Sequence, residues 1–198
     1  SIFAVLAVKN TAVAQTTITS SATPMVGYTY SMSADTAAAD MPTFTVSAGS
    51  ASAQSWDYSQ GFNNANGAAI SFVAPAGNPG ASSFPNSNLA SDQGSGNWGY
   101  LIAGTNGLYV DGAYVTLQGT SAALDFNPDA PQLPTPFTYN NTTTVTYTAT
   151  ATTTYSGTPI QINHIATRTV TADAFGTIIT PAGTYSNTLR VYTHETTS

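Results

Sequence analysis

Threonine alternates with apolar residues along the stretch TTTVTYTATATTTY, which covers residues 142–155. A period of two is typical of a β-strand, because successive side chains point to opposite faces of the sheet. A second alternating run, IQINHIATRTVTA, begins at Ile160 and follows the short segment SGTP. The two runs predict a β-hairpin with threonine on one face and apolar side chains on the other.

The register of this hairpin follows if SGTP forms the whole loop. Tyr155 then lies opposite Ile160, and a ladder of threonine pairs covers one face. The predicted pairs are Thr148 with Thr167, Thr146 with Thr169 and Thr144 with Thr171, while Val145 faces Val170 on the other side. Cross-strand pairs of this kind stabilise a sheet by roughly 0.2–1 kcal/mol each. We therefore interpret the ladder as part of the scaffold.

Shorter alternating runs predict further strands along the chain. They cover residues 25–33, 43–48, 54–59, 68–75, 100–103, 108–110 and 113–119, and a final strand carries Leu189 and Val191. The dipeptide Asn106-Gly107 predicts a hairpin turn. Turn residues also predict a long surface loop over residues 76–99, a proline-rich crossing over 125–136, and turns at 173–176 and 181–183.

Many short strands without a credible helix predict an all-β fold. We expect an antiparallel β-sandwich, Ig-like or jelly-roll-like, with long loops rich in Gly, Ser, Asn and Pro. The chain of 198 residues is long enough for a single domain of this kind. We place this domain at residues 16–198 and treat residues 1–15 as a separate N-terminal arm.

The arm begins SIFAVLAVKNTAVA and is apolar on both faces of any strand that it forms. One interpretation is the remnant of a secretory signal peptide, with Ala12-Val13-Ala14 as the cleavage motif. The other is a retained strand that inserts into a neighbouring subunit, because a strand apolar on both faces must be buried on both sides. The residues that would carry this assembly strand are Ile2, Phe3, Val5, Leu6 and Val8.

Composition narrows the range of partners. Charged residues make up only 6% of the chain, whereas an ordinary soluble domain has roughly a quarter. The three cations cannot line a nucleic-acid groove, so we exclude that partner. There is no cysteine, which excludes disulfides and thiolate metal sites, and no apolar run approaches the roughly 20 residues of a membrane-spanning helix.

Candidate catalytic chemistry is sparse. His164 and His194 are the only histidines, no G-x-S-x-G motif places a nucleophile, and no pair of aspartates suggests an acid–base site. We therefore predict that the chain is not an enzyme and needs no cofactor. Asp125, Asn127 and Asp129 have the spacing of a calcium loop. Ala130 follows them where such a loop has glycine, so a proline-bounded turn is favoured and calcium is the alternative.

Two aromatic pairs raise the alternative of glycan binding. Trp56 with Tyr58 and Trp98 with Tyr100 each occur at a spacing of two, with asparagines nearby. Rings on one face of a strand can form a platform for a sugar, although the same spacing is more often found in a core.

The segment VTADAFGTIITPAGTYSNTLRVYT, residues 170–193, resembles secreted proteins of Bacteroidetes that carry a C-terminal type IX secretion sorting domain. The resemblance extends to PFTYNN, SWDYS and ISFVAPAGNPGASSFPNSNLAS, and covers most of the chain from about residue 39. It implies export to the cell surface or the extracellular space, for a module of unknown activity, and brings no catalytic residues. The sorting domain itself is absent from this sequence. Thr36, within Asp35-Thr36-Ala37, fits the O-glycosylation pattern of that group.

These observations together predict an extracellular structural protein. It would be the subunit of a surface filament or layer, pilus-like, and its partner would be a second copy that receives the N-terminal strand. The alternative is a monomeric adhesin or carbohydrate-binding module of a larger exported protein, with glycans as partners.

Overall fold

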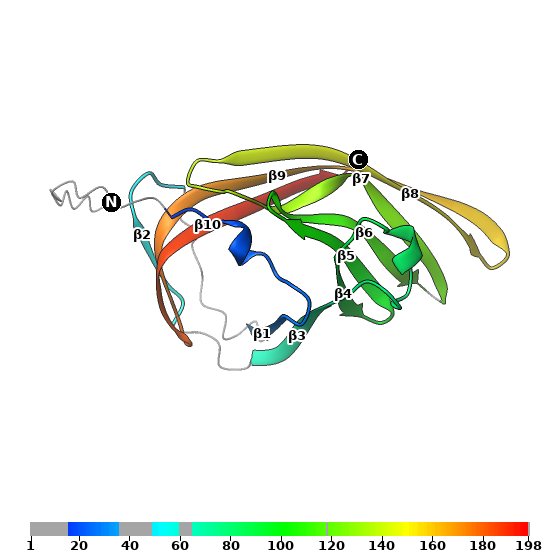
Figure 1. The fold of residues 1–198 in the computed structure, drawn as a ribbon, viewed down its shortest axis with the longest axis horizontal. Helices are drawn as coiled ribbons and strands as arrows, with labels where there is room; N and C mark the ends of the chain where they lie inside the picture. The colour runs from blue at the N-terminus through cyan, green and yellow to red at the C-terminus, as the bar shows by residue number, and fades with distance from the viewer. Residues whose placement is uncertain (1–15, 36–48, 60–64, 118, 198) are drawn as a thin grey trace, which may run out of the picture.

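Ten β-strands form one continuous sheet in the computed structural model, which describes residues 16–35, 49–59, 65–117 and 119–197 (Figure 1). The strands are β1 (Thr29–Asp35), β2 (Gln54–Asp57), β3 (Ala65–Val73), β4 (Leu89–Gly94), β5 (Asn97–Gly104), β6 (Gly107–Leu117), β7 (Thr120–Pro134), β8 (Thr142–Tyr155), β9 (Thr158–Thr180) and β10 (Gly183–Thr197). Their order in the sheet is β1-β3-β4-β5-β6-β7-β8-β9-β10, and β2 pairs with β9. All pairs are antiparallel except β2 with β9, so the all-β antiparallel prediction is confirmed.

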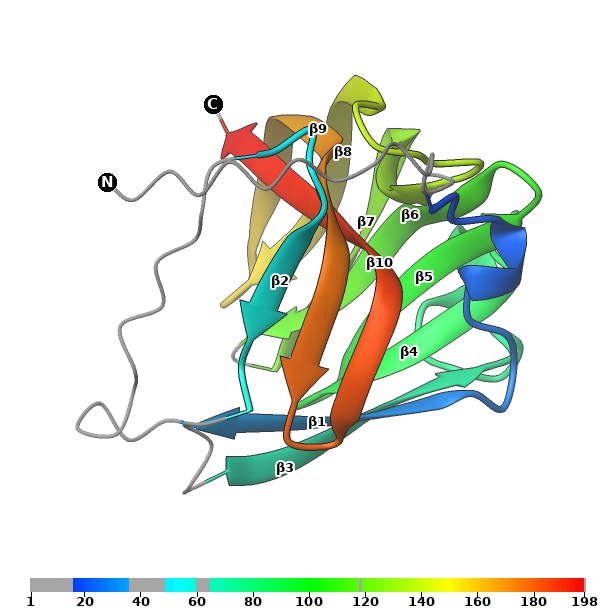
Figure 2. The same cartoon turned by 90° about the vertical axis from the view of Figure 1, so that its left-hand side faces the viewer.

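The sheet curls, so that its last strands arch over its first ones (Figures 1 and 2). Strand β9 is the longest at 23 residues. On one side it pairs with β10, and on the other it pairs first with β8 and then, past the end of β8, with β2. Because the strands form one continuous sheet, its division into the two sheets of a sandwich stays a prediction.

The threonine hairpin is confirmed, but its predicted register is wrong by two residues. Tyr155 pairs with Thr158, which leaves only Ser156 and Gly157 in the turn. Both have positive φ, 49° and 79°, as a type I′ turn requires. A shift of two keeps every side chain on its predicted face.

The threonine ladder therefore forms with different partners. The hydroxyl pairs are Thr142–Thr171 at 3.2 Å, Thr144–Thr169 at 3.0 Å and Thr146–Thr167 at 2.8 Å. Val145 lies opposite Arg168, and Val170 lies opposite Thr143.

Three loop and turn predictions are wrong. The predicted loop at residues 76–99 contains β4 and the start of β5, joined at Ser95 and Gly96, which both have positive φ. The predicted crossing at 125–136 belongs mostly to β7, which accommodates its prolines because it pairs with β8 only at residues 125–127 and is an edge beyond them. The predicted turn at 173–176 lies inside β9, where Gly176 permits a close approach of β2.

Residues 16–28, here called the strap, run from the segment between β7 and β8 to β3 (Figure 2). Near its start, Ile18 exchanges two backbone hydrogen bonds with Phe137. At its end, the amide of Gly27 donates to the carbonyl of Phe72 at 2.8 Å. Between these points the strap holds a 3₁₀ turn (Ser20–Ala22) and the buried Pro24. A second 3₁₀ turn (Ala81–Ser83) precedes β4.

The core consists of several apolar clusters rather than one. Phe72, Leu89, Leu101 and Leu108 pack together on the β3–β6 half of the sheet. Phe137, Val170, Ala172 and Leu189 form a second cluster under β9 and β10.

Candidate functional site

The β1 end of the sheet is an open edge among the described residues. Strand β1 pairs with β3 on one side, and no strand of residues 16–35, 49–59, 65–117 or 119–197 pairs with its other side. Large apolar side chains are exposed next to this edge: Met25, Val26, Tyr28 and Tyr30 are 41–66% exposed. The ring of Tyr30 packs edge-on against Tyr28 at 5.0 Å and against Phe72 at 5.6 Å. An unpaired edge beside apolar side chains is the surface that strand addition uses.

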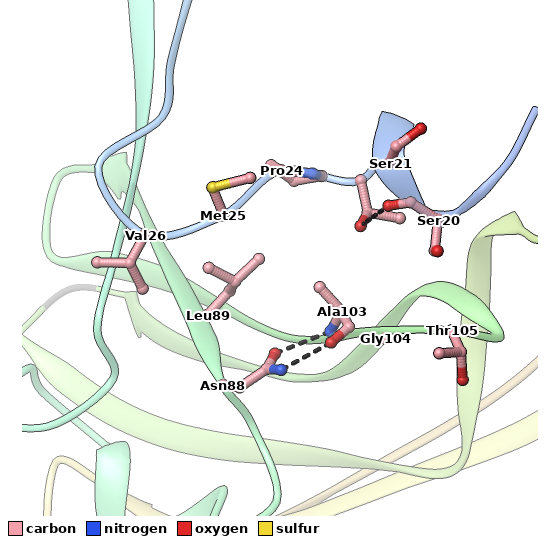
Figure 3. A pocket seen from close by; sticks show the side chains of 11 residues that line it. Ser20, Ser21, Pro24, Met25, Val26, Asn88, Leu89, Ala103, Gly104 and Thr105 are labelled. Carbon is pink, nitrogen blue, oxygen red and sulfur yellow. Dashed lines mark hydrogen bonds between the residues drawn. The ribbon is translucent and has the colours of Figure 1, made fainter.

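A groove lies between the strap and the ends of β4 and β5 (Figure 3). It has a volume of about 640 Å³, and Met25 and Val26 of the strap face Leu89 across it. The side chain of Asn88 links the two strands at the base of the groove. It donates to the carbonyl of Ala103 at 2.7 Å and accepts from the backbone amide of Ala103 at 2.8 Å. The groove continues the exposed apolar surface of the β1 edge.

The first predicted aromatic pair belongs to the packing of β2 on β9. Trp56 is only 9% exposed, and the guanidinium of Arg190 lies 5.7 Å from its ring centroid. Arg190 also donates two hydrogen bonds to the carboxylate of Asp173, at 2.7 and 2.8 Å. The indole nitrogen of Trp56 is buried and has no hydrogen-bond partner within the described ranges. Tyr58 follows β2, and its amide donates to the carbonyl of Ile179.

The second aromatic pair lies on β5 and is part of a different cluster. Tyr100 is fully buried, stacks on Phe84 at 4.4 Å and donates its hydroxyl to the carbonyl of Pro79. Burial raises its pKa, and Tyr114 adds to the effect. Trp98 is half-buried beside it. The structure therefore does not bring the four predicted rings onto one surface, and Tyr100 offers no face to a sugar.

The residues of the predicted calcium loop lie on β7, where the strand bulges. Gly112 of β6 pairs with Asp125, whereas Val110 pairs with Ala130, so four residues of β7 oppose the single residue Asp111. This bulge brings Asp111, Asp125 and Asp129 together, while Asn127 is exposed and pairs with Thr148 of β8.

Asp111 is the buried member of this acidic cluster. Its carboxylate accepts a hydrogen bond from Ser87 at 2.7 Å, and the side chain of Asp129 lies next to it. Burial and the neighbouring carboxylates raise the pKa of Asp129, and burial and Asp111 raise that of Asp125. Within the described residues no group of three His, Cys, Asp or Glu side chains has the arrangement of a metal site. Calcium binding stays a prediction.

A polar cluster joins β8, β9 and β10 and was not predicted. Tyr147 donates its hydroxyl to the carboxylate of Glu195 at 2.8 Å, and Arg168 donates to the same oxygen at 2.6 Å. The Arg168 guanidinium lies 5.7 Å from the centroid of the Tyr147 ring, and His164 packs on the same ring. Glu195 is the only glutamate of a chain with 6% charged residues. Its rarity was the one feature of the sequence that could have pointed to this cluster.

The remaining predicted residues lie outside the described ranges. These are the assembly-strand residues Ile2, Phe3, Val5, Leu6 and Val8, and the O-glycosylation candidate Thr36. Among the described residues, no helix is long and apolar enough to cross a membrane. Comparisons of the chain with protein-family models, with curated proteins and with solved structures find no match.

Proposed function

We propose that the protein is an extracellular structural subunit that assembles into a filament or layer by N-terminal strand exchange. The segment of residues 2–8 of one copy would pair with the open β1 edge of the next copy. The curled sheet would serve as a sandwich-like body, in which the β9–β10 half faces the β3–β6 half. The resemblance to secreted Bacteroidetes proteins supports the location and belongs to the same proposal.

The open β1 edge is the observation that carries this proposal. An exposed edge is a liability that proteins usually blunt with charge, proline or a covering segment. Here Tyr28 and Tyr30 lie next to the edge, and the chain has only three cations with which to protect it. Strand β1 is seven residues long, and the apolar segment 2–8 has the same length. Main-chain hydrogen bonds would supply affinity, and apolar side chains at alternate positions would supply specificity.

Low charge favours assembly for a second reason. Charged residues make up only 6% of the chain. The surface that a polymer would bury is apolar and uncharged, because Met25, Val26, Tyr28 and Tyr30 lie at the open edge, so little charge must be desolvated on assembly.

Deletion of residues 1–14 tests the proposal. The truncated protein should be a folded monomer with unchanged far-UV circular dichroism, whereas the full chain should form filaments or sheets visible by electron microscopy. Leu6→Asp should block assembly in the same way, because it places a charge in the middle of an apolar strand. Leu6→Val is the matched control and should assemble.

Two results would contradict strand exchange. Polymers that persist after the deletion would show that another surface assembles the subunit. A full chain that stays monomeric at high concentration would favour the alternative of a monomeric module.

A further inference from the structure

A hollow of about 650 Å³ lies between the two halves of the curled sheet, apart from the groove beside the strap. Phe72, Leu101 and Leu108 of β3, β5 and β6 form its concave wall. Val191 and Thr193 of β10 face them from the opposite side. Ala22 and Pro24 of the strap also line it. Pockets for small molecules are typically about 300–1,000 Å³, so the hollow has the size of a ligand site.

The lining of the hollow is mostly apolar and carries no charged side chain. None of the described residues that line it is Asp, Glu, Lys, Arg or His. The hollow is open to solvent, because the lining residues Ala22, Gln132 and Thr193 are exposed. A molecule that binds there would displace water from the apolar walls, which is favourable in proportion to the apolar area covered.

A few polar side chains in the lining can form hydrogen bonds with a bound molecule. Ser91 is 3% exposed, and its hydroxyl oxygen accepts a hydrogen bond from Nε2 of Gln93 at 2.6 Å. The hydroxyl keeps one proton that it can donate to an acceptor inside the hollow. Gln132 accepts from Arg168 through its Oε1 at 3.3 Å, and its NH2 group is a second donor among the lining residues. The hydroxyl of Ser91 and the NH2 group of Gln132 can therefore both donate to a neutral acceptor oxygen.

We propose that the hollow binds an uncharged, elongated apolar molecule that carries a neutral acceptor oxygen, such as a fatty acyl ester. A free carboxylate is disfavoured, because the lining offers no positive charge and a buried unpaired charge is costly. The site is built from described residues of β1, β3–β7, β10 and the strap, so it does not depend on the N-terminal arm or on assembly.

Fluorescence of N-phenyl-1-naphthylamine, an uncharged apolar dye, tests binding to the full chain. The dye should bind with saturation at one site per chain. Methyl laurate should displace it, and laurate, whose head is charged, should displace it at least about tenfold less well. Both competitors are used below their solubility limits. No saturable dye binding, or equal displacement by the acid and the ester, would overturn the proposal.

Substitutions on β10 and β4 test whether the dye binds in the hollow. Thr193→Trp should abolish dye binding, because Thr193 is an exposed lining residue of β10 and tolerates a larger side chain that enters the hollow. Thr196→Trp is the matched control on the same strand, outside the hollow, and should bind normally. Ser91→Ala should weaken the binding of methyl laurate about fivefold, which corresponds to the loss of one hydrogen bond of about 1 kcal/mol. The affinity for the dye should not change. Loss of binding in Thr196→Trp but not in Thr193→Trp would overturn the assignment.

The deletion of residues 1–14 separates this proposal from the assembly proposal. Binding of the dye to both the full chain and the truncated chain supports a ligand site, whatever happens to polymers. Binding to the truncated chain alone would identify the N-terminal arm as the occupant of the hollow and would overturn the ligand proposal.

Discussion

Replacement of Tyr147 by phenylalanine isolates one hydrogen bond that holds three strands together. Tyr147 of β8 is 1% exposed, and its hydroxyl donates to Glu195 of β10 at 2.8 Å. Arg168 of β9 donates to the same carboxylate oxygen, so the substitution leaves Glu195 with its ion pair. The ring of Tyr147 also stacks on Phe126 at 4.9 Å, and phenylalanine keeps this contact.

The expected loss of stability follows from the charge on the acceptor. A hydrogen bond to a charged group contributes about 1.5–3 kcal/mol to the free energy of unfolding. For a domain of this length, each kcal/mol changes Tm by about 2–4 °C, so Tyr147→Phe should lower Tm by roughly 3–12 °C.

The contribution of Tyr147 to stability should depend on pH in the alkaline range. Burial, followed by the hydrogen bond to Glu195, raises the pKa of Tyr147 from the ordinary 10.0 of a tyrosine to about 12. Because the folded-state pKa is raised, the contribution is fully present below pH 10 and is lost as the pH rises through 12. A gap of two pH units corresponds to about 2.7 kcal/mol. The wild type should therefore lose its advantage over Tyr147→Phe between pH 10 and pH 12.

Urea unfolding at pH 7, 10 and 11 measures both effects, and phenolate absorbance follows the ionisation of tyrosine. Tyr192→Phe is the matched control, because Tyr192 lies on β10 and is 55% exposed. Its unfolding midpoint should stay close to that of the wild type at every pH. A Tyr147→Phe variant that costs no more than the control at pH 7, or a difference that is unchanged between pH 7 and pH 11, would contradict this role of the hydroxyl.

Two further substitutions test the packing of β2 and the acidic cluster. Gly176→Ala should detach β2 from β9, because an added Cβ would collide with the carbonyl oxygen of Gln54. The detachment should expose Trp56 and shift its fluorescence to the red. An unchanged spectrum would contradict this role of Gly176. Asp129→Asn should raise the urea midpoint at pH 7, because burial and the charge of Asp111 raise the pKa of Asp129 and make its ionised form destabilising. Because the folded-state pKa of Asp129 is raised, the wild type loses stability as the pH rises above the ordinary aspartate range. The stability gained by Asp129→Asn should therefore shrink toward pH 4. A gain that does not change with pH would contradict the raised pKa of Asp129.

The alternation of apolar and polar residues was enough to predict most strands of the sheet. It identified β8 and β9 and placed their threonines on one face, because a period of two survives a register error of two residues. It did not fix the register, because Ser156 takes a positive φ that serine rarely adopts, and this shortened the turn.

Other parts of the fold depend on contacts between distant residues. The sequence DAFG contains turn-forming residues, but Gly176 serves to admit the backbone of Gln54, and no local pattern shows this approach. The prolines of β7 suggested a crossing, although an edge strand accommodates them.

The candidate sites were predicted less well than the fold. The spacing of Asp125 and Asp129 drew attention to β7, but their neighbour Asp111 comes from another strand and from a bulge that the sequence does not mark. The aromatic pairs have the right spacing for a surface platform, yet Tyr100 is buried because β5 is a central strand. The hollow could not be predicted, because its walls come from seven strands and the strap.

The pairing of β2 with β9 constrains the order in which the chain can fold. Residues 54–57 must wait for residues 176–179, which are on the order of a hundred residues later, and loop closure over such a length is slow. The β4–β7 meander can form early from local hairpins, whereas β2 docks only after β9 is in place. During this interval the edge of β9 at residues 176–179 stays unpaired, so the protein should be most prone to edge-to-edge aggregation late in folding, and a chaperone that shields an exposed strand would act at that stage.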